Sequence, residues 1–307
     1  MSAPPVASTA KAPIPLWLDW GSRVPWPLLY GFGSALAWIA RRVLRYRLKV
    51  VRSNVAGAFA ALAPRQRRRI ERQYYRRLGE LAVEVVKSAA MPADELNRRI
   101  TLHGLEVLRT ELDAGRSVLV LAAHQCNWEW LLLALSLKLG HPVDAAYKPL
   151  HDPGSERWMH AIRTRFGGTL VPAKELLAHI LRERGPRAVA MVADQEPVTS
   201  DYKWWTSFLD RSTAFYQGPE KIAEVTRYAV AFASMRRIAR GRYEVGFELM
   251  FPARASLDPG ALTERYARLV EAQIRASPED WTWSHRRWKL RRPVYANSAS
   301  APDRESP

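Results

Sequence analysis

The residues best suited to chemistry lie in the segment SVLVLAAHQCNWEWLLLALSLKLG, residues 117–140, where His124 and Glu129 are five positions apart. The apolar run over residues 118–123 predicts a buried strand. A second apolar run, residues 128–139, is long enough for a helix. The two polar residues therefore lie at a strand-to-helix corner, which is where α/β sheets bind their ligands.

A carboxylate can make such a histidine a general base. On one continuous helix, residues five apart point about 140° away from each other and do not meet. If His124 ends the strand, its ring can fold back onto Glu129 in the first helical turn. The carboxylate would then hold the Nδ1–H and leave Nε2 free to take a proton. The alternative is structural, with Glu129 complementing the helix dipole and His124 serving as a capped core histidine.

The only cysteine of the chain, Cys126, lies in the same segment. A nucleophilic Cys–His pair is therefore an alternative to general-base chemistry. Because Glu129 already supplies a partner for the histidine, we expect Cys126 to be a small buried side chain. The histidines show no metal-ligand spacing, and the sequence contains no glycine-rich phosphate loop. We expect neither a metal nor another cofactor.

Another apolar run, residues 188–193, also ends in polar side chains, here Asp194 and Gln195. Helical segments separate the two runs, which predicts parallel β-α-β units whose carboxyl edges share one crevice. Residues 228–238 and 242–251 predict an antiparallel hairpin. The predicted fold is α/β, with a central mixed, mostly parallel sheet flanked by helices.

The chain carries a net charge of +17, dominated by arginine. Such a charge implies a polyanionic partner, which could be nucleic acid, an anionic membrane surface, an acidic protein or a phosphorylated substrate. Residues 64–90 predict an amphipathic helix with an arginine-rich polar side. That side is either a solvated face or a surface for anionic headgroups or an acidic protein. We also expect residues 202–216 to form an aromatic-rich loop and residues 278–289 to form a helix.

The distribution of apolar and charged residues divides the chain into a membrane-associated segment and one catalytic domain. Residues 1–23 and 294–307 have no core pattern and predict disordered tails. Residues 24–40 carry no charge, and basic residues follow at once, so we expect residues 24–49 to form an uncleaved membrane anchor, barely spanning or lying in the interface. An ordinary buried core helix is the alternative. The basic flank predicts that the domain of residues 50–293 is cytoplasmic.

Several segments resemble one known family. HQCNWE resembles the H-x-x-x-x-[DE] motif of the glycerolipid and lipid A acyltransferase superfamily. RSNVAGAF, ERQYYRRLGELAVE, ADQEP and WTWSHRRWK resemble, in that order, segments of the late lipid A acyltransferases, the lauroyl/myristoyl branch. The similarity extends from about Pro25 to Pro293. Many motifs in the same order are far more specific than any single one.

The resemblance implies transfer of a fatty acyl group from an acyl carrier protein thioester to a hydroxyl of a lipid A precursor, a phosphorylated glucosamine disaccharide lipid. It also implies a place at the bacterial inner membrane. His124 would deprotonate the hydroxyl, and Glu129 would orient its imidazole. A basic enzyme would attract an acidic carrier protein, and its anionic partners would include the membrane surface. Nucleic acid is not an expected partner.

Further residues are expected to bind substrate. They are Asn127 within the motif, Lys148 where the family commonly has arginine, Arg163 and Arg165, and the pair Asp194 and Gln195, which matches the family's Asp-Gln pair. Lys148, Arg163 and Arg165 are the candidates for phosphate binding, and the alternative for each is an unpartnered surface charge.

Some positions depart from the family pattern. Glu196 replaces a usual Asp, and Trp204, Trp205 and Asp210 replace the aromatic-glycine pattern of the enterobacterial enzymes. We expect these departures to affect which acceptor is bound and not the acyl-transfer chemistry. A lysophospholipid, an amino-acid lipid or an aryl polyene product are the alternative acceptors.

Two other functions would explain part of the sequence. A basic protein that binds membrane surfaces or nucleic acid would explain the charge but gives no role to HQCNWE or ADQEP. A hydrolase would use the same His–Glu pair to activate water, and it would release free fatty acid even when an acceptor is present.

Overall fold

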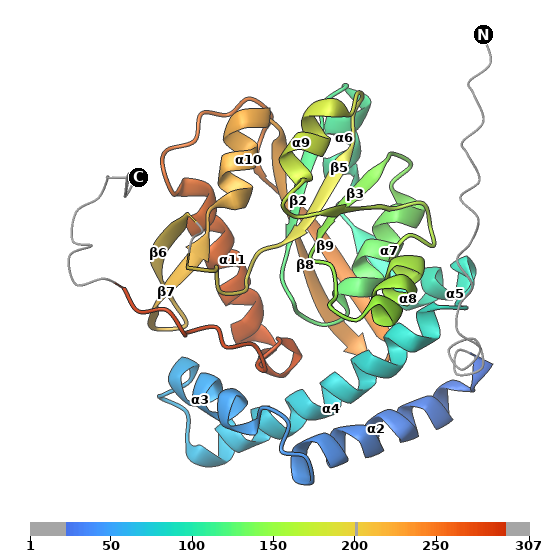
Figure 1. Ribbon diagram of the computed structural model, residues 1–307, viewed down its shortest axis with the longest axis vertical. Coiled ribbons are helices and arrows are strands. Elements are labelled where there is room, and N and C mark those ends of the chain that lie inside the picture. The colour runs from blue at the N-terminus through green and yellow to red at the C-terminus, as the bar shows by residue number, and fades with distance from the viewer. Residues whose placement is uncertain (1–22, 200–201, 293–307) are drawn as a thin grey trace.

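The computed structural model describes residues 23–199 and 202–292, and Figure 1 shows their arrangement. Apart from Arg23, the two predicted tails lie outside the described residues. In the described part of the chain, the main sheet has seven strands. Their order across the sheet is β1 (Ile100–His103), β9 (Arg242–Phe251), β8 (Ala229–Ala239), β2 (Val118–Ala122), β5 (Ala188–Val192), β3 (Val143–Tyr147) and β4 (Thr169–Pro172).

The predicted α/β fold with a mixed, mostly parallel sheet is confirmed. Neighbouring strands pair in parallel except for β8 and β9, which form the predicted antiparallel hairpin. β2 lies between β5 and β8 at the centre of the sheet. The segment that carries the polar corner is therefore held by hydrogen bonds on both sides.

The alternation of side chains along β2 divides the core into two halves. Val118, Val120 and Ala122 belong to one buried cluster, whereas Leu119 and Leu121 belong to the other. All five side chains are buried. Because helices cover both faces, the strand reads as a continuous apolar run instead of an alternating one.

Helices cover both faces of the sheet, as Figure 1 shows. The side of Val120 is covered by α5 (Ala93–Arg99), α6 (Leu105–Asp113), α7 (Trp128–Lys138) and α8 (Pro153–Arg163). The side of Leu121 is covered by α9 (Leu176–Arg182), α10 (Gly218–Thr226) and α11 (Ala261–Ala276).

Two aromatic-rich segments differ from the prediction. Residues 202–216, predicted as a loop, contain a hairpin of β6 (Lys203–Phe208) and β7 (Arg211–Tyr216). Its turn residues Leu209 and Asp210 both have positive φ, 51° and 59°, as a two-residue hairpin turn needs. The turn contains no glycine, which is the usual signal of a two-residue hairpin turn. The helix predicted over residues 278–289 is only the short 3₁₀ turn η1 (Pro278–Asp280).

Three helices, α2 (Trp26–Arg42), α3 (Leu48–Ala58) and α4 (Pro64–Ser88), lie along the lower edge of the molecule in Figure 1. The predicted membrane anchor corresponds to α2, which packs against α4. Within residues 23–199 and 202–292, no helix combines the length and apolarity that crossing a bilayer requires. The spanning form of the predicted anchor is therefore not found.

The helices α2 and α4 approach each other through two glycines. A Cβ atom on Gly33 would lie 2.7 Å from the carbonyl oxygen of Gly79, and one on Gly79 would lie 2.2 Å from that of Gly33. Tyr30 adds a hydrogen bond of 3.0 Å from its hydroxyl to the buried carboxylate of Glu84. Small residues at the crossing therefore let the two backbones touch, and α2 is fixed to α4.

We expect Gly33→Ala to destabilise the protein, whereas Gly31→Ala in the same helix should not. The added methyl at Gly31 meets no atom within 4 Å, and alanine raises helix propensity by up to about 1 kcal/mol. At Gly33 the methyl would collide with backbone, and overpacking costs about 1–3 kcal/mol. Thermal unfolding followed by circular dichroism compares the two variants. A midpoint for Gly33→Ala at or above that of Gly31→Ala would contradict the close helix crossing.

Candidate active site

His124 and Asp194 meet at the carboxyl ends of the two central parallel strands. β2 and β5 pair in register, with Ala122 opposite Val192, so the residues two positions further along each chain lie side by side. The Nδ1 atom of His124 is 2.7 Å from a carboxylate oxygen of Asp194. The backbone N–H of His124 donates to the same carboxylate at 3.1 Å. The neighbouring strand therefore supplies the partner of the histidine.

The environment of Asp194 defines the tautomer of the imidazole. Burial opposes ionisation of this fully buried carboxyl, but His124 and the hydrogen bonds from His124 and from the Trp281 indole outweigh it and lower the pKa of Asp194. An ionised carboxylate only accepts hydrogen bonds, so Nδ1 carries the proton. In the neutral imidazole Nε2 then has a free lone pair.

Glu129 was predicted as the carboxylate that holds His124, and the geometry corrects that prediction. Both carboxylate oxygens of Glu129 accept from the guanidinium of Arg163, at 2.8 and 2.6 Å. One of them also accepts from the Trp128 indole at 3.2 Å. Glu129, in the first turn of α7, forms an ion pair with Arg163 at the end of α8. Asp194, which follows β5, forms the hydrogen bond to the imidazole of His124.

The segment after α11 fastens the corner from the other side. The backbone N–H and the side-chain hydroxyl of Thr282 both donate to the carbonyl of His124, at 3.1 and 2.9 Å. Trp281 donates its indole N–H to Asp194 at 2.7 Å. The N–H of Cys126 bonds to the carbonyl of Asp280 at 2.9 Å. Residues 280–282 thus hold both members of the His–Asp pair.

Tyr266 of α11 joins the ends of the two strands. Its hydroxyl donates to the carbonyl of Ala122 at 2.7 Å and accepts from the N–H of Ala193 at 3.2 Å. The ring is buried. Because Ala122 lies two residues before His124 and Ala193 lies one residue before Asp194, this bridge fixes the spacing between the two polar corners.

Cys126 is buried, as predicted, and its thiol is 3.5 Å from the carbonyl oxygen of Met235. Burial raises the pKa of the Cys126 thiol well above its usual range. The thiol is therefore protonated at neutral pH, and a thiolate is what nucleophilic attack requires. Its position favours a packing role over a covalent one.

A cavity of about 380 Å³ opens beside His124. Its polar wall contains five of the predicted site residues, His124, Glu129, Lys148, Arg163 and Gln195. Much of the remaining wall is apolar, including Val120, Ala122, Leu131, Leu132 and Leu135 from β2 and α7. The cavity therefore combines an apolar surface with an imidazole and basic side chains.

The other predicted site residues lie behind or beside this wall. Asn127 is buried, caps α7 through the N–H of Trp130 at 3.0 Å, and donates to Glu84 of α4 at 2.8 Å. Arg165 donates to the carbonyl of Ser88 at 2.9 Å. Asp194 supports the imidazole from within the core. Of the three phosphate candidates, Arg163 is engaged by Glu129, Arg165 by a carbonyl, and Lys148 is exposed at the cavity.

Trp281, Tyr266 and Arg287 are site residues that the sequence did not reveal. Arg287 is fully buried, with its guanidinium 4.4 Å from the centroid of the Phe215 ring. Its three nitrogens have no hydrogen-bond partner among the described residues. Burial lowers the pKa of Arg287 to about 10, while Asp194 and Glu196 oppose that shift. For Trp281 and Arg287, the only signal in the sequence was that their segment, WTWSHRRWK, resembles a segment of the late lipid A acyltransferases.

The family follows from a comparison of the whole chain. Residues 16–290 match the family model described as bacterial lipid A biosynthesis acyltransferase. The matched region contains both polar corners and the segment that fastens them. The chain belongs to the family of bacterial lipid A biosynthesis acyltransferases, and it is an acyltransferase.

Characterised relatives cover nearly the same length. A lipid A biosynthesis lauroyltransferase of Escherichia coli K12 is 24% identical over 300 residues, 94% of this chain and 96% of that protein. A lipid A biosynthesis palmitoleoyltransferase of the same organism is 24% identical, covering 90% of this chain and 92% of that protein. Among solved structures, the 1-acyl-sn-glycerophosphate acyltransferase PlsC of Thermotoga maritima matches with a TM-score of 0.38 and 14% identity, over 82% of this chain and 96% of that one.

Proposed function

We propose that the protein moves a fatty acyl group from an acyl carrier protein thioester to a hydroxyl of a lipid A precursor, with His124 as the general base and Asp194 as the residue that orients it. The observation that carries this proposal is the Nδ1–carboxylate hydrogen bond of 2.7 Å at the wall of a largely apolar cavity. With the proton on Nδ1, Nε2 is the basic atom of His124, which lines the cavity that a substrate can enter.

The proposed reaction needs no covalent enzyme intermediate. Nε2 of His124 takes the proton of the acceptor hydroxyl while the oxygen attacks the thioester carbonyl. The resulting imidazolium lies beside an ionised Asp194, which stabilises its charge. The thiolate of the carrier then leaves and takes the proton from the imidazolium, so that the ester forms and His124 is again neutral. The raised pKa and the burial of Cys126 support a route that bypasses it.

The oxyanion also needs hydrogen-bond donors. The first turn of α7 begins four residues after His124, and the first N–H groups of a helix have no acceptor inside it. Asn127 accepts from the N–H of Trp130, so those of Trp128 and Glu129 are the proposed donors.

Glu129 enters the proposal through Arg163, because their bidentate ion pair keeps the guanidinium at the cavity wall. Burial opposes the charge of Arg163, but Glu129 outweighs it and raises the pKa of this arginine. Glu129 is thus proposed as a positioning residue.

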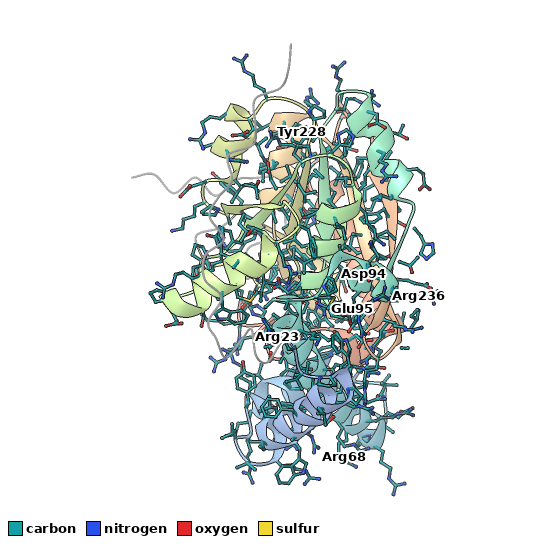
Figure 2. All side chains as sticks on the ribbon, turned by 90° about the vertical axis from the view of Figure 1, so that its right-hand side faces the viewer. Arg23, Arg68, Asp94, Glu95, Tyr228 and Arg236 are labelled. Carbon is teal, nitrogen blue, oxygen red and sulfur yellow. The ribbon has the colours of Figure 1, made fainter. Side chains whose placement is uncertain are left out.

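The carrier protein is proposed as donor because of charge. α4 exposes Arg65, Arg68, Arg69, Arg72 and Arg76, and Figure 2 shows Arg68 at the lower end of the molecule, pointing outward. Exposed guanidinium groups of one sign steer an acidic protein toward the enzyme. The same charge also suits an anionic membrane surface.

Association with the inner membrane through α2, with the catalytic domain on the cytoplasmic side, is part of the same proposal. The helix exposes large apolar side chains that the rest of the protein does not cover, among them Leu28, Phe32 and Trp38 at 65, 60 and 61%. Arg41 and Arg42 follow in its last turn. An exposed apolar face beside cations is what an interfacial helix presents to an anionic bilayer.

Replacing either member of the His–Asp pair should stop acyl transfer. We expect His124→Ala to abolish it and Asp194→Asn to lower kcat about 10²- to 10⁴-fold, the usual range for lost general-base catalysis. The measurement is mass spectrometry of the acylated lipid together with released free fatty acid. His103→Ala, which replaces an exposed histidine on β1, is the matched control and should be fully active.

Circular dichroism would verify that each variant is folded. A folded His124→Ala or Asp194→Asn protein with wild-type transfer would reject the mechanism. Free fatty acid as the main product of the wild type in the presence of acceptor would show that the enzyme is a hydrolase.

Membrane binding should weaken when α2 loses its exposed apolar side chains. Each large side chain contributes about 1.5–3 kcal/mol when fully buried, so Phe32→Ser/Trp38→Ser should reduce binding at least about tenfold. Sedimentation with phosphatidylglycerol-containing vesicles measures it. The matched control is Leu177→Ser/Leu181→Ser on α9, which removes exposed leucines at the opposite end of the molecule in Figure 1. Equal loss in both double variants would exclude a specific role for α2.

A further inference from the structure

A second, larger hollow lies between the N-terminal helices and the C-terminal segment. It is a cleft of about 1210 Å³ formed by the end of α2, the start of α3, the chain after Gln195 and residues 285–290. We call it the basic cleft, because among the described residues eight arginine or lysine side chains and one carboxylate, that of Glu196, line it. The mechanism described above does not use it.

Most of these cations lack a counter-ion. Five of them, Arg42, Arg45, Lys49, Arg286 and Lys289, have neither an ion pair nor a side-chain hydrogen bond within the described ranges. They come from both walls, three from the α2–α3 region and two from the C-terminal segment. Like charges that face one another across a cleft repel, and a bound anion would relieve that repulsion.

The remaining cations are held in place by the protein. Arg41 and Arg52 both donate to the buried carboxylate of Glu71, each at 2.9 Å. Arg47 donates to the carbonyl of Ser284 at 3.1 Å, which links the two walls of the cleft. The cleft therefore has a fixed frame, and the five unpaired cations project from it.

The backbone between α2 and α3 is in an unusual conformation. Arg45 and Arg47 have positive φ angles of 49° and 48°, a region that costs free energy for residues other than glycine. Arginine stands at both positions, where glycine or asparagine would be less strained. Arg45 and Arg47, on either side of Tyr46 in this turn, both line the basic cleft.

Apolar side chains alternate with these cations. Val43, Leu44 and Tyr46 are 60, 70 and 47% exposed, and they continue the exposed apolar face of α2. A ligand that fits this edge carries negative charge on one part and hydrocarbon on another. That combination describes an anionic lipid better than an acidic protein.

The basic cleft also adjoins the catalytic cavity along the chain. Gln195 lines the cavity, and the next residues, Glu196 and Pro197, line the cleft. The N–H of Glu196 donates to Nε2 of His285 at 3.0 Å, and its carboxylate accepts from the N–H of Leu290. The segment of residues 195–197 therefore contributes to the walls of both the cavity and the basic cleft.

We propose that the basic cleft binds the phosphate groups of the acceptor lipid while the hydroxyl to be acylated enters the cavity at His124. The inference rests on the proposed function for the identity of the acceptor. Arginine binds phosphate with charge-assisted, often bidentate hydrogen bonds. At about 1210 Å³ the cleft is somewhat larger than usual small-molecule sites of about 300–1,000 Å³, and that size suits a disaccharide headgroup with its phosphates.

Binding is measured in the His124→Ala background, so the test does not depend on turnover. The probes are a phosphorylated glucosamine-disaccharide lipid and its phosphatase-treated counterpart, both in the same nonionic detergent micelles. We expect Arg45→Gln/Arg286→Gln to weaken binding of the phosphorylated lipid at least about tenfold, since one hydrogen bond to a charged group is worth about that factor. Binding of the dephosphorylated lipid should not change.

The matched control is Arg182→Gln/Arg184→Gln, two exposed arginines at the α9 end of the molecule, and it should bind both lipids like the wild type. Equal affinity for both lipids in the parent protein, or an unchanged affinity in the cleft variant, would overturn the inference. So would inorganic phosphate binding as tightly as the lipid, which would make this a site for the free anion. The same two substitutions are also made in the active enzyme, where normal lipid binding with a raised KM for acyl carrier protein would assign the cleft to the donor.

These outcomes separate the inference from the function on which it rests. If phosphorylated lipid binds through the cleft but is never acylated, the proposed acceptor is wrong and the phosphate site remains. If the lipid is acylated and the cleft variant is unaffected in binding and KM, the acceptor is right and the phosphate site is wrong.

Discussion

The ionised carboxylate of Asp194, buried at the end of a central strand, is the constraint on which the rest of the site depends. A buried charge is costly unless hydrogen bonds and opposite charge compensate it, and removing one partner typically costs about 3–5 kcal/mol. Asp194 receives donors from the His124 backbone, the His124 ring and the Trp281 indole. The same bonds that make the carboxylate tolerable fix the orientation of the imidazole. Stability of the corner and orientation of the base therefore have one physical cause.

The surrounding elements serve this corner from several sides. Tyr266 sets the spacing of the two strand ends, and Thr282 holds the carbonyl of His124. Behind the motif, Asn127 starts α7 and also bonds to Glu84, which accepts from Tyr30 of α2 and from the Tyr243 hydroxyl. Burial raises the pKa of Glu84 although its three hydrogen-bond donors oppose that shift. A continuous polar network thus connects α2, which we propose lies at the membrane, to the first turn of α7.

The sequence predicted the strand, the helix and the polar corner because each is encoded locally. Residues 118–123 are continuously apolar, and the polar residues interrupt the pattern only where the strand ends. The partner of His124 could not be read in the same way. Glu129 is close in sequence, but Asp194 becomes its neighbour only through the register of β2 with β5, a contact between residues 70 positions apart. The hairpin turn at Leu209 was missed for a local reason. Its backbone has positive φ, but no glycine marks the position in the sequence.

The central claim is that Asp194, and not Glu129, holds the Nδ1 proton of His124. It is tested most directly by ¹⁵N NMR of protein labelled at its seven histidines, with the signals of His124 identified from their loss in His124→Ala. We predict a protonated Nδ1 and an unprotonated Nε2 in the neutral imidazole of His124. We also predict that this pattern shifts in Asp194→Asn and persists in Glu129→Gln. A proton on Nε2 in the wild type, or a pattern that changes with Glu129→Gln and not with Asp194→Asn, would contradict it.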